Sequence, residues 1–191
     1  MLGACSTGGP EPRISIRVVD FVRRFGQAET RPASGRFGLA QHTLGGTLRA
    51  SIDVPVPSRT IWSIPIPRRA TLNALAGVLP ASVPAIVRFR VGVSDDRIYE
   101  ELVSHTVIAE AGREGGWAPI QADLSAYAGW QWSIFFRPER RAWRVVLSTD
   151  AVEVEGAGNR AIWGEPGIDT DLAAARHFVH ERLGYRGPNN R

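Results

Sequence analysis

The sequence contains no lysine, so all 23 of its basic residues are arginines. They are set against 19 acidic residues, which leaves a formal net charge of +4. Most arginines stand singly among acidic residues, and the exceptions are the Arg-Arg pairs at 23–24, 68–69 and 140–141. A nucleic-acid-binding chain is expected to carry a basic run or a recognisable binding module. Neither is present, so we expect no nucleic-acid partner.

Cysteine is almost absent as well, because Cys5 is the one cysteine of the sequence. A disulfide within the chain is therefore excluded. The stretch Leu-Gly-Ala-Cys-Ser around Cys5 matches the pattern at which bacterial lipoprotein signal peptides are cleaved and the cysteine is acylated. A tether-like Thr-Gly-Gly-Pro-Glu-Pro follows, but the charged and apolar regions of a signal peptide do not precede it. We predict a lipid anchor at Cys5 and a location in the bacterial cell envelope, on its periplasmic or outer face. The alternative is that the match is coincidental.

Long hydrophobic runs and catalytic motifs are also missing. No segment approaches the roughly 20 apolar residues of a membrane-spanning helix. Serine-nucleophile, P-loop, dinucleotide-binding and zinc-protease patterns are all absent. We therefore expect no enzyme, no catalytic residue and no cofactor.

The residues that are present are typical of one β-rich domain. The 191 residues are 43% hydrophobic and 22% charged, which suits a single folded core. Glycine and proline separate short runs of alternating apolar residues, as in an all-β protein with many turns. We divide the chain into a lipobox-like start and tether (1–12), an N-terminal helix and connecting loop (13–46), a β-sandwich domain (47–168) and a C-terminal helix and tail (169–191).

The N-terminal segment 13–26 is compatible with two periodicities. Read as a helix, it gathers five apolar residues on one face, namely Ile14, Val18, Phe21, Val22 and Phe25. Read as a strand, it alternates at Ile14, Ile16 and Val18. The helical count is longer and predicts a short amphipathic helix that ends at Gly26. Its apolar face would pack on the core of the domain or, as the alternative, against a membrane or a partner.

From residue 47 onward the period drops to two, which indicates half-buried strands. The prolines at 65 and 67 should end one of these strands early or place it at an edge. The pattern predicts strands at 47–56, 62–66, 70–75, 87–93, 99–108, 117–122, 130–136, 143–147, 152–154 and 160–168. A set of this size, with turns between its members, is expected of a sandwich or jelly roll.

The C-terminal segment changes to a helical pattern. The stretch 169–171, Asp-Thr-Asp, can cap a helix from Leu172 to Leu183. On such a helix His177 and His180 would face one side and could share a metal ion, but a solvated helix face is the favoured interpretation. Calcium candidates exist only by residue type, and we assign them to turns: Asp95, Asp96, Asp123, Asp150 and Asp169. We therefore expect no metal.

Three stretches together resemble a known bacterial domain. They are Phe89-Arg-Val-Gly-Val-Ser-Asp-Asp, Trp117 with Asp123-Leu-Ser-Ala-Tyr-Ala-Gly129, and Trp163-Gly-Glu-Pro166. In combination they resemble the extracytoplasmic β-sandwich found in envelope lipoproteins and beside sulfatases and membrane glycosyltransferases, which is similar to galactose-binding-like carbohydrate-binding modules. The resemblance covers about residues 45–168. It implies a mainly β, jelly-roll-like antiparallel sandwich in which Trp117 and Trp163 fill the core, and it carries no catalytic residues.

The remaining tryptophans and arginines supply a candidate contact surface. Arginine and tryptophan concentrate at protein interfaces, and an indole face also stacks on sugars. The mixture of both near residue 140 is the best candidate and comprises Trp130, Trp132, Arg137, Arg140, Arg141, Trp143 and Arg144.

Two functions follow from these observations. The first is a non-catalytic, envelope-associated interaction module, an accessory subunit of a membrane protein complex that contacts the membrane through its lipid anchor or N-terminal helix. The alternative is a carbohydrate-binding module that recognises envelope glycans. A subunit should show a large apolar contact area. A glycan binder should show a groove or platform with aromatic and polar neighbours.

Overall fold

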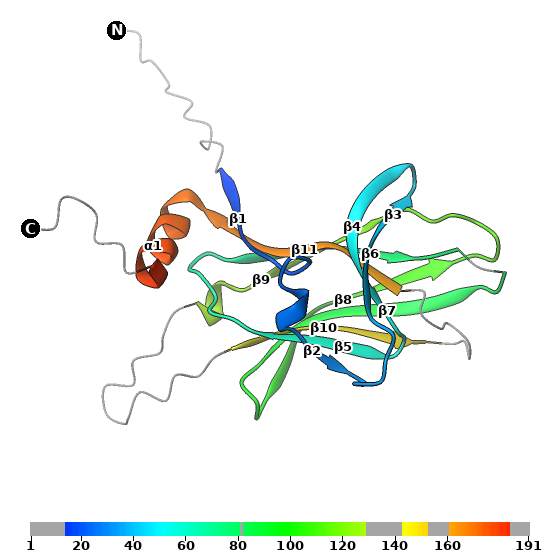
Figure 1. Ribbon diagram of the computed structural model, residues 1–191, viewed down its shortest axis with the longest axis horizontal. Coiled ribbons are helices and arrows are strands. Elements are labelled where there is room, and N and C mark those ends of the chain that lie inside the picture. The colour runs from blue at the N-terminus through cyan, green and yellow to red at the C-terminus, as the bar shows by residue number, and fades with distance from the viewer. Residues whose placement is uncertain (1–13, 81, 129–142, 153–160, 184–191) are drawn as a thin grey trace, which may run out of the picture.

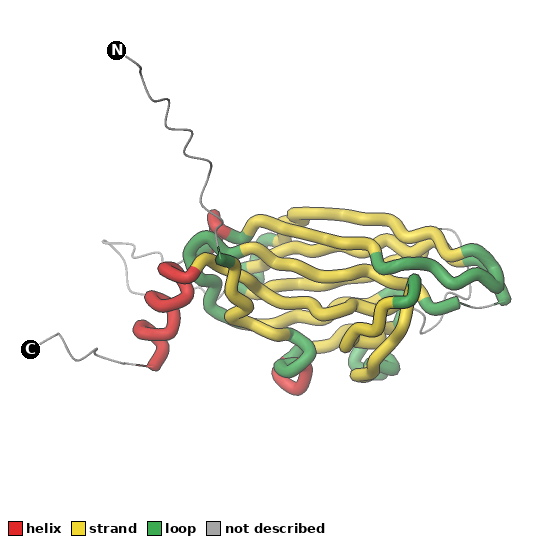
Figure 2. The backbone as a smooth tube through the Cα atoms, turned by 90° about the horizontal axis from the view of Figure 1, so that it is seen from above, coloured by secondary structure: helices red, strands yellow, loops and turns green. Residues whose placement is uncertain are grey.

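The structure is a computed structural model that describes residues 14–80, 82–128, 143–152 and 161–183. Two antiparallel sheets lie face to face and form a jelly-roll-like β-sandwich (Figure 1). Seen from above in Figure 2, the helix α1 extends beyond one end of the strands. Within the described ranges, no helix has the length and apolar character needed to cross a membrane.

The first sheet has the strand order β3-β4-β11-β6-β9, and β1 also pairs with β11. Its members are β1 (Ser15–Asp20), β3 (Gly38–Leu44), β4 (Thr47–Val54), β6 (Thr71–Val78), β9 (Ala118–Asp123) and β11 (Ala161–Asp171). The second sheet has the order β2-β5-β10-β7-β8. Its members are β2 (Glu29–Arg31), β5 (Ser58–Ser63), β7 (Ala85–Ser94), β8 (Tyr99–Ala109) and β10 (Arg144–Ala151). Two short 3-10 turns, Phe25–Gln27 and Ser125–Tyr127, and the helix α1 (Leu172–Leu183) complete the described elements.

One edge of β11 is shared by two strands. The first half of β11 pairs with β4 from Ala161 to Gly164, and the second half pairs with β1 from Gly167 to Asp171. The other edge of β11 pairs with β6, and the register of that pairing shifts between Gly164 and Gly167. Glu165 therefore lies at an irregular point of the sheet, where β4 ends its pairing and β1 begins.

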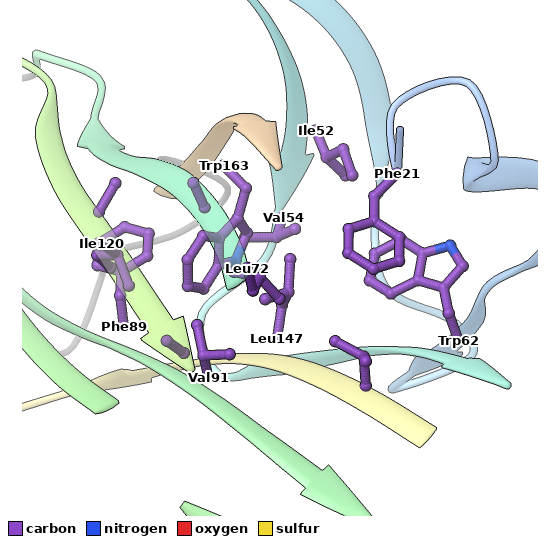
Figure 3. Packing of buried hydrophobic residues seen from close by; sticks show 14 of the residues in the cluster. Phe21, Ile52, Val54, Trp62, Leu72, Phe89, Val91, Ile120, Leu147 and Trp163 are labelled. Atoms are coloured by element: carbon purple, nitrogen blue, oxygen red, sulfur yellow. The ribbon is translucent and has the colours of Figure 1, made fainter. Parts of the chain in front are cut away.

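The core fills the space between the two sheets (Figure 3). Trp163 from the first sheet meets Phe89 from the second edge to face, with ring centroids 5.0 Å apart. Phe21 and Trp62 form a second aromatic contact at 4.4 Å. All four side chains are at most 1% exposed. The core position predicted for Trp163 is confirmed.

The predicted sandwich is confirmed by these strands. Along β7, Val87, Phe89 and Val91 are buried while Arg88 is exposed, which is the alternation that the sequence shows. The run before Pro65 forms β5 and ends at Ser63, because proline cannot donate a ladder hydrogen bond. Predicted strands at 130–136 and 153–154 lie outside the described residues.

The prediction of an N-terminal helix over 13–26 is wrong. Residues 15–20 form β1, and only a 3-10 turn follows at Phe25–Gln27. The reason is tertiary, because the free edge of β11 offers hydrogen bonds to a segment rich in β-branched residues. A register shift between Arg17 and Val19 then turns Val19 into the core. The connecting loop expected before residue 47 also contains β2 and β3.

The predicted C-terminal helix is confirmed as α1. Asp171 caps it, since its carboxylate accepts a hydrogen bond of 2.8 Å from the backbone N–H of Ala174. Arg69 donates a second hydrogen bond of 2.8 Å to the other carboxylate oxygen. These bonds, with that of Ala174 first, lower the pKa of Asp171 below its usual value.

Acidification should therefore weaken the N-terminal cap of α1. Because the folded-state pKa of Asp171 is depressed, the cap is complete above the unfolded pKa of about 3.9 and is lost as the pH falls through the folded value. An NMR titration of the Asp171 carboxyl carbon should show the low pKa. In Asp171→Asn, which caps without a charge, amide exchange in α1 should lose its acid dependence. If the Asp171 carboxyl group titrated with its ordinary pKa, this result would contradict the cap.

Candidate ligand-binding groove

A groove of about 430 Å³ lies against the first sheet. Its lining residues come from five strands of this sheet, namely β9, β6, β11, β1 and β4. Its side-chain lining comprises Arg17, Arg49, Asn73, Leu75, Pro119, Gln121 and Glu165.

Strand alternation places these side chains on the outer face. In β6, Leu72, Ala74 and Ala76 belong to the core, so Asn73 and Leu75 point away from it. In β9, Ile120 and Ala122 belong to the core, so Pro119 and Gln121 point outward in the same way. The register pairs Asn73 with Gln121 and Leu75 with Pro119. Two rows thus run side by side across the sheet, one polar and one apolar.

The polar row is a chain of hydrogen bonds from β9 to β1. Gln121 Nε2 donates to Asn73 Oδ1 at 3.1 Å, and Asn73 Nδ2 donates to Asp169 Oδ2 at 2.7 Å. Arg17 forms an ion pair with Asp169, whose side chain is only 15% exposed. Arg17 Nη1 also donates to the backbone oxygen of Glu165 at 2.9 Å. The row is therefore held in place before any ligand arrives.

The apolar row continues from Leu75 and Pro119 to Trp117. The outward positions next to Leu75 are glycines, Gly77 on β6 and Gly164 on β11. A Cβ added to Gly164 would lie 2.7, 3.1 and 3.1 Å from Cζ3, Cε3 and Cη2 of Trp117. Three atoms of one six-membered ring at such similar distances show that the ring lies flat on the backbone of Gly164. The indole Nε1 donates to the backbone oxygen of Thr47 at 2.8 Å.

The expectation that Trp117 fills the core is therefore wrong. Residues 118, 120 and 122 face the core, so residue 117 has the opposite phase and lies on the outside. Leu44 covers the neighbouring backbone of Gly77, where an added Cβ would lie 2.5 Å from Leu44 Cδ1. The half-buried indole is thus part of the outer surface beside the groove.

The end of the groove at β4 and β11 is formed by an ion pair. Arg49 Nη1 donates to Glu165 Oε2 at 3.0 Å, and both side chains are about two-fifths exposed, at 38% and 42%. Glu165 has φ of 43°, in the left-handed region that favours glycine. This strained residue stands at the irregular point of β11 described above.

Most of the contact surface predicted near residue 140 lies outside the described residues, as does Cys5. This applies to Trp130, Trp132, Arg137, Arg140 and Arg141. Trp143 and Arg144 are described, and neither lines the groove.

Trp143 and Arg144 are both occupied by contacts within the domain. Trp143 packs against the core and meets Tyr127 edge to face, with centroids 5.0 Å apart. Burial, together with a hydrogen bond to Glu100, raises the pKa of Tyr127 to about 12. Arg144 Nη1 pairs with Asp96 at 2.7 Å and lies 3.6 Å from Glu29.

The described candidate metal ligands take part in turns and ion pairs. No cluster of three or more histidine, cysteine, aspartate or glutamate side chains occurs in the described ranges. Asp95 and Asp123 accept backbone hydrogen bonds in turns, from Ile98 and Ser125 respectively. The other described candidates are in ion pairs: Asp96 with Arg144, Asp150 with Arg90 and Asp169 with Arg17. His177 is exposed on α1, and the side chain of His180, its partner in the predicted pair, lies outside the described part of the chain.

Comparison with known proteins yields likeness in fold. No family model matches the chain, and no curated protein matches it. The CBM22-2 xylan-binding domain from Paenibacillus barcinonensis is 11% identical over 82% of this chain and 98% of that one, with a TM-score of 0.48. The CBM51-2 and INT domains of Clostridium perfringens ZmpB are 13% identical over 85% of this chain and 34% of that one, with a TM-score of 0.49.

A third counterpart is matched over about a quarter of its length. The CBM22-1 and GH10 modules of a Clostridium thermocellum xylanase, solved with xylohexaose, are 10% identical over 83% of this chain and 28% of that one, with a TM-score of 0.44. At identities this low the likeness concerns the fold and says nothing about a ligand.

Proposed function

We propose that this chain is a non-catalytic glycan-binding module and that the groove on the first sheet binds the sugar. The observation that carries the proposal is the pairing of the two rows. A fixed polar row from Gln121 to Arg17 runs beside an apolar row that leads from Pro119 to the flat indole of Trp117. A pyranose has the same division, with hydroxyl groups at its edge and C–H groups on its faces.

The polar row suits hydroxyl groups because it offers both donors and acceptors. Amide and guanidinium groups present several N–H donors in one plane, and amide and carboxylate oxygens accept. Since the row is pre-bonded, a ligand need not order these side chains when it binds, which reduces the entropic cost of association. The apolar row supplies the surface against which a sugar face can pack.

The size of the groove suits a short oligosaccharide. Its lining spans β9, β6, β11 and the strand pair β1 and β4. With neighbouring strands about 4.8 Å apart, three such steps cover about 14 Å.

The described surface supports glycan binding better than an accessory-subunit role. A stable protein interface needs a contiguous apolar area of several hundred Å² per partner. Several exposed large apolar side chains lie on different elements, with Ile14 before β1, Leu39 on β3, Ile98 before β8 and Val179 on α1. Ile108 and Val152 lie together on either side of Ile86 on the second sheet, but this group comprises few side chains. We take envelope glycans as the ligand source, since the pattern around Cys5 predicts a module anchored there.

A glycan panel with matched glutamine variants tests this proposal. Purified full-length chain should bind at least one polysaccharide from a panel that includes xylan, chitin, peptidoglycan and envelope polysaccharides. Gln121→Ala removes one end of the polar row and should weaken that binding about tenfold, since a lost hydrogen bond in such a setting costs roughly 1.4 kcal/mol. Affinity is measured by titration calorimetry.

Gln41 provides the control. It is exposed on β3 and is not part of the groove lining. Gln41→Ala should therefore bind as the wild type does. Failure of the wild-type chain to bind any glycan of the panel, or equal losses in the two variants, would overturn the proposal.

A further inference from the structure

Two unfavourable features meet at one point of the groove. Glu165 holds a left-handed backbone conformation, with φ of 43°. Its partner Arg49 has a buried Nε that makes no hydrogen bond to any described residue. The two side chains contact each other through Arg49 Nη1 and Glu165 Oε2, and both line the groove.

The backbone conformation of Glu165 points to a ligand at this place. Strained backbone persists mainly where function requires a side chain to be aimed. Within the described part of the chain, Glu165 Oε1 accepts no hydrogen bond. The pair therefore presents an acceptor, Glu165 Oε1, beside the Arg49 side chain, which is 38% exposed.

The carboxylate of Asp169, next to the groove-lining residues Arg17 and Asn73, is already paired. Asp169 accepts from Arg17 and from Asn73, so its charge is paired with that of Arg17. Arg49 is paired with Glu165 in the same way. The two arginines of the groove are thus neutralised, and an incoming anion gains little attraction from them.

We propose, resting on the glycan-binding function above, that the Arg49–Glu165 pair is the subsite that selects uncharged sugars over acidic ones. A sugar hydroxyl group can donate a hydrogen bond to Glu165 Oε1 beside the partly exposed Arg49 side chain. A carboxylate or sulfate group cannot donate to Glu165. It would also place a second negative charge within a few ångström of that side chain, where like charges repel.

The variant Glu165→Gln tests the selection with sugars that differ at C6, where a carboxylate replaces the hydroxymethyl group. The probes are matched polymers, polygalacturonate against its carboxyl-reduced form and β-1,4-mannan against β-1,4-polymannuronate, together with cello-oligosaccharides and their C6-oxidised forms. At low ionic strength the wild-type chain should bind the neutral member of its preferred pair at least tenfold more tightly. Glutamine keeps the size and an acceptor oxygen but lacks the charge. The preference should fall below threefold, mainly because the acidic member binds better.

Glu101→Gln is the matched control, because Glu101 lies on β8 of the second sheet, where it pairs with Arg90 at 3.4 Å. This variant should keep the wild-type preference. Equal binding of neutral and acidic members by the wild type leaves the glycan-binding function standing and overturns the selection. An unchanged preference in Glu165→Gln overturns it too. Binding of neither member of any pair overturns both proposals.

Discussion

Replacing Phe21 with alanine is expected to lower the free energy of unfolding by about 3 to 5 kcal/mol. Phe21 is fully buried, at 0% exposure, and its ring centroid lies 4.4 Å from that of Trp62 on the opposite sheet. Removal of the ring leaves a cavity that the two sheets cannot close, because the aromatic pair joins them at this point. Equilibrium denaturation in urea, followed by tryptophan fluorescence, measures the change.

Ile14 offers a control in the same segment. Its side chain is 65% exposed, so Ile14→Ala should change the free energy of unfolding by less than about 0.5 kcal/mol. If the N-terminal segment belongs to the sandwich, only the variant at its buried residue, Phe21, should lose stability. If Phe21→Ala were as stable as Ile14→Ala, the N-terminal segment would not be part of the core.

Alanine in place of Gly164 is expected to displace the indole of Trp117 and weaken glycan binding by tenfold or more. The added Cβ would lie 2.7 Å from Cζ3 of Trp117, well inside van der Waals contact, and the ring has to lift from the sheet. The end of the apolar row is then lost, together with the hydrogen bond from the indole to Thr47. A red shift of the tryptophan emission should accompany the loss of affinity.

Gly26→Ala is the matched control, because no heavy atom lies within 4 Å of a Cβ added at Gly26. It should leave both the emission spectrum and glycan affinity at wild-type values. A Gly164→Ala protein that shifts its emission but binds glycan normally would remove Trp117 from the binding surface. A protein without the shift would contradict the flat packing of the ring.

The strands of the sandwich could be predicted because their signal is local. In β7 the buried residues Val87, Phe89 and Val91 alternate with Arg88 and Arg90, and in β4 the buried residues Ile52 and Val54 flank the less buried Asp53. Burial of one face requires that period and no other, so the sequence alone carries the information. The cap at Asp171 is local in the same sense, since the residue that caps and the N–H that it binds are three positions apart.

The N-terminal segment and Trp117 show where local reasoning fails. Residues 15–20 form a strand because β11, about 150 positions later, leaves an edge unpaired beside them. Trp117 lies outside because Gly77 and Gly164 from two other strands leave a flat surface for its ring. Neither the free edge nor the glycine surface can be seen until the strand order is known.

The groove could not have been predicted for the same reason. Its polar row joins Gln121, Asn73, Asp169 and Arg17, which belong to four strands. The one local signal is Asn73, a polar residue between Leu72 and Ala74 in an otherwise apolar strand. That signal marks an outward position without telling which neighbours complete a site.

Because β1 and β4 share one edge of β11, the groove can form only after β11 has been synthesised. Arg17, which lines the groove, and its partner Asp169 are 152 positions apart, so an N-terminal portion emerging during synthesis lacks half of this contact. If the groove binds sugar as proposed, we expect truncated chains that lack β11 not to bind polysaccharide.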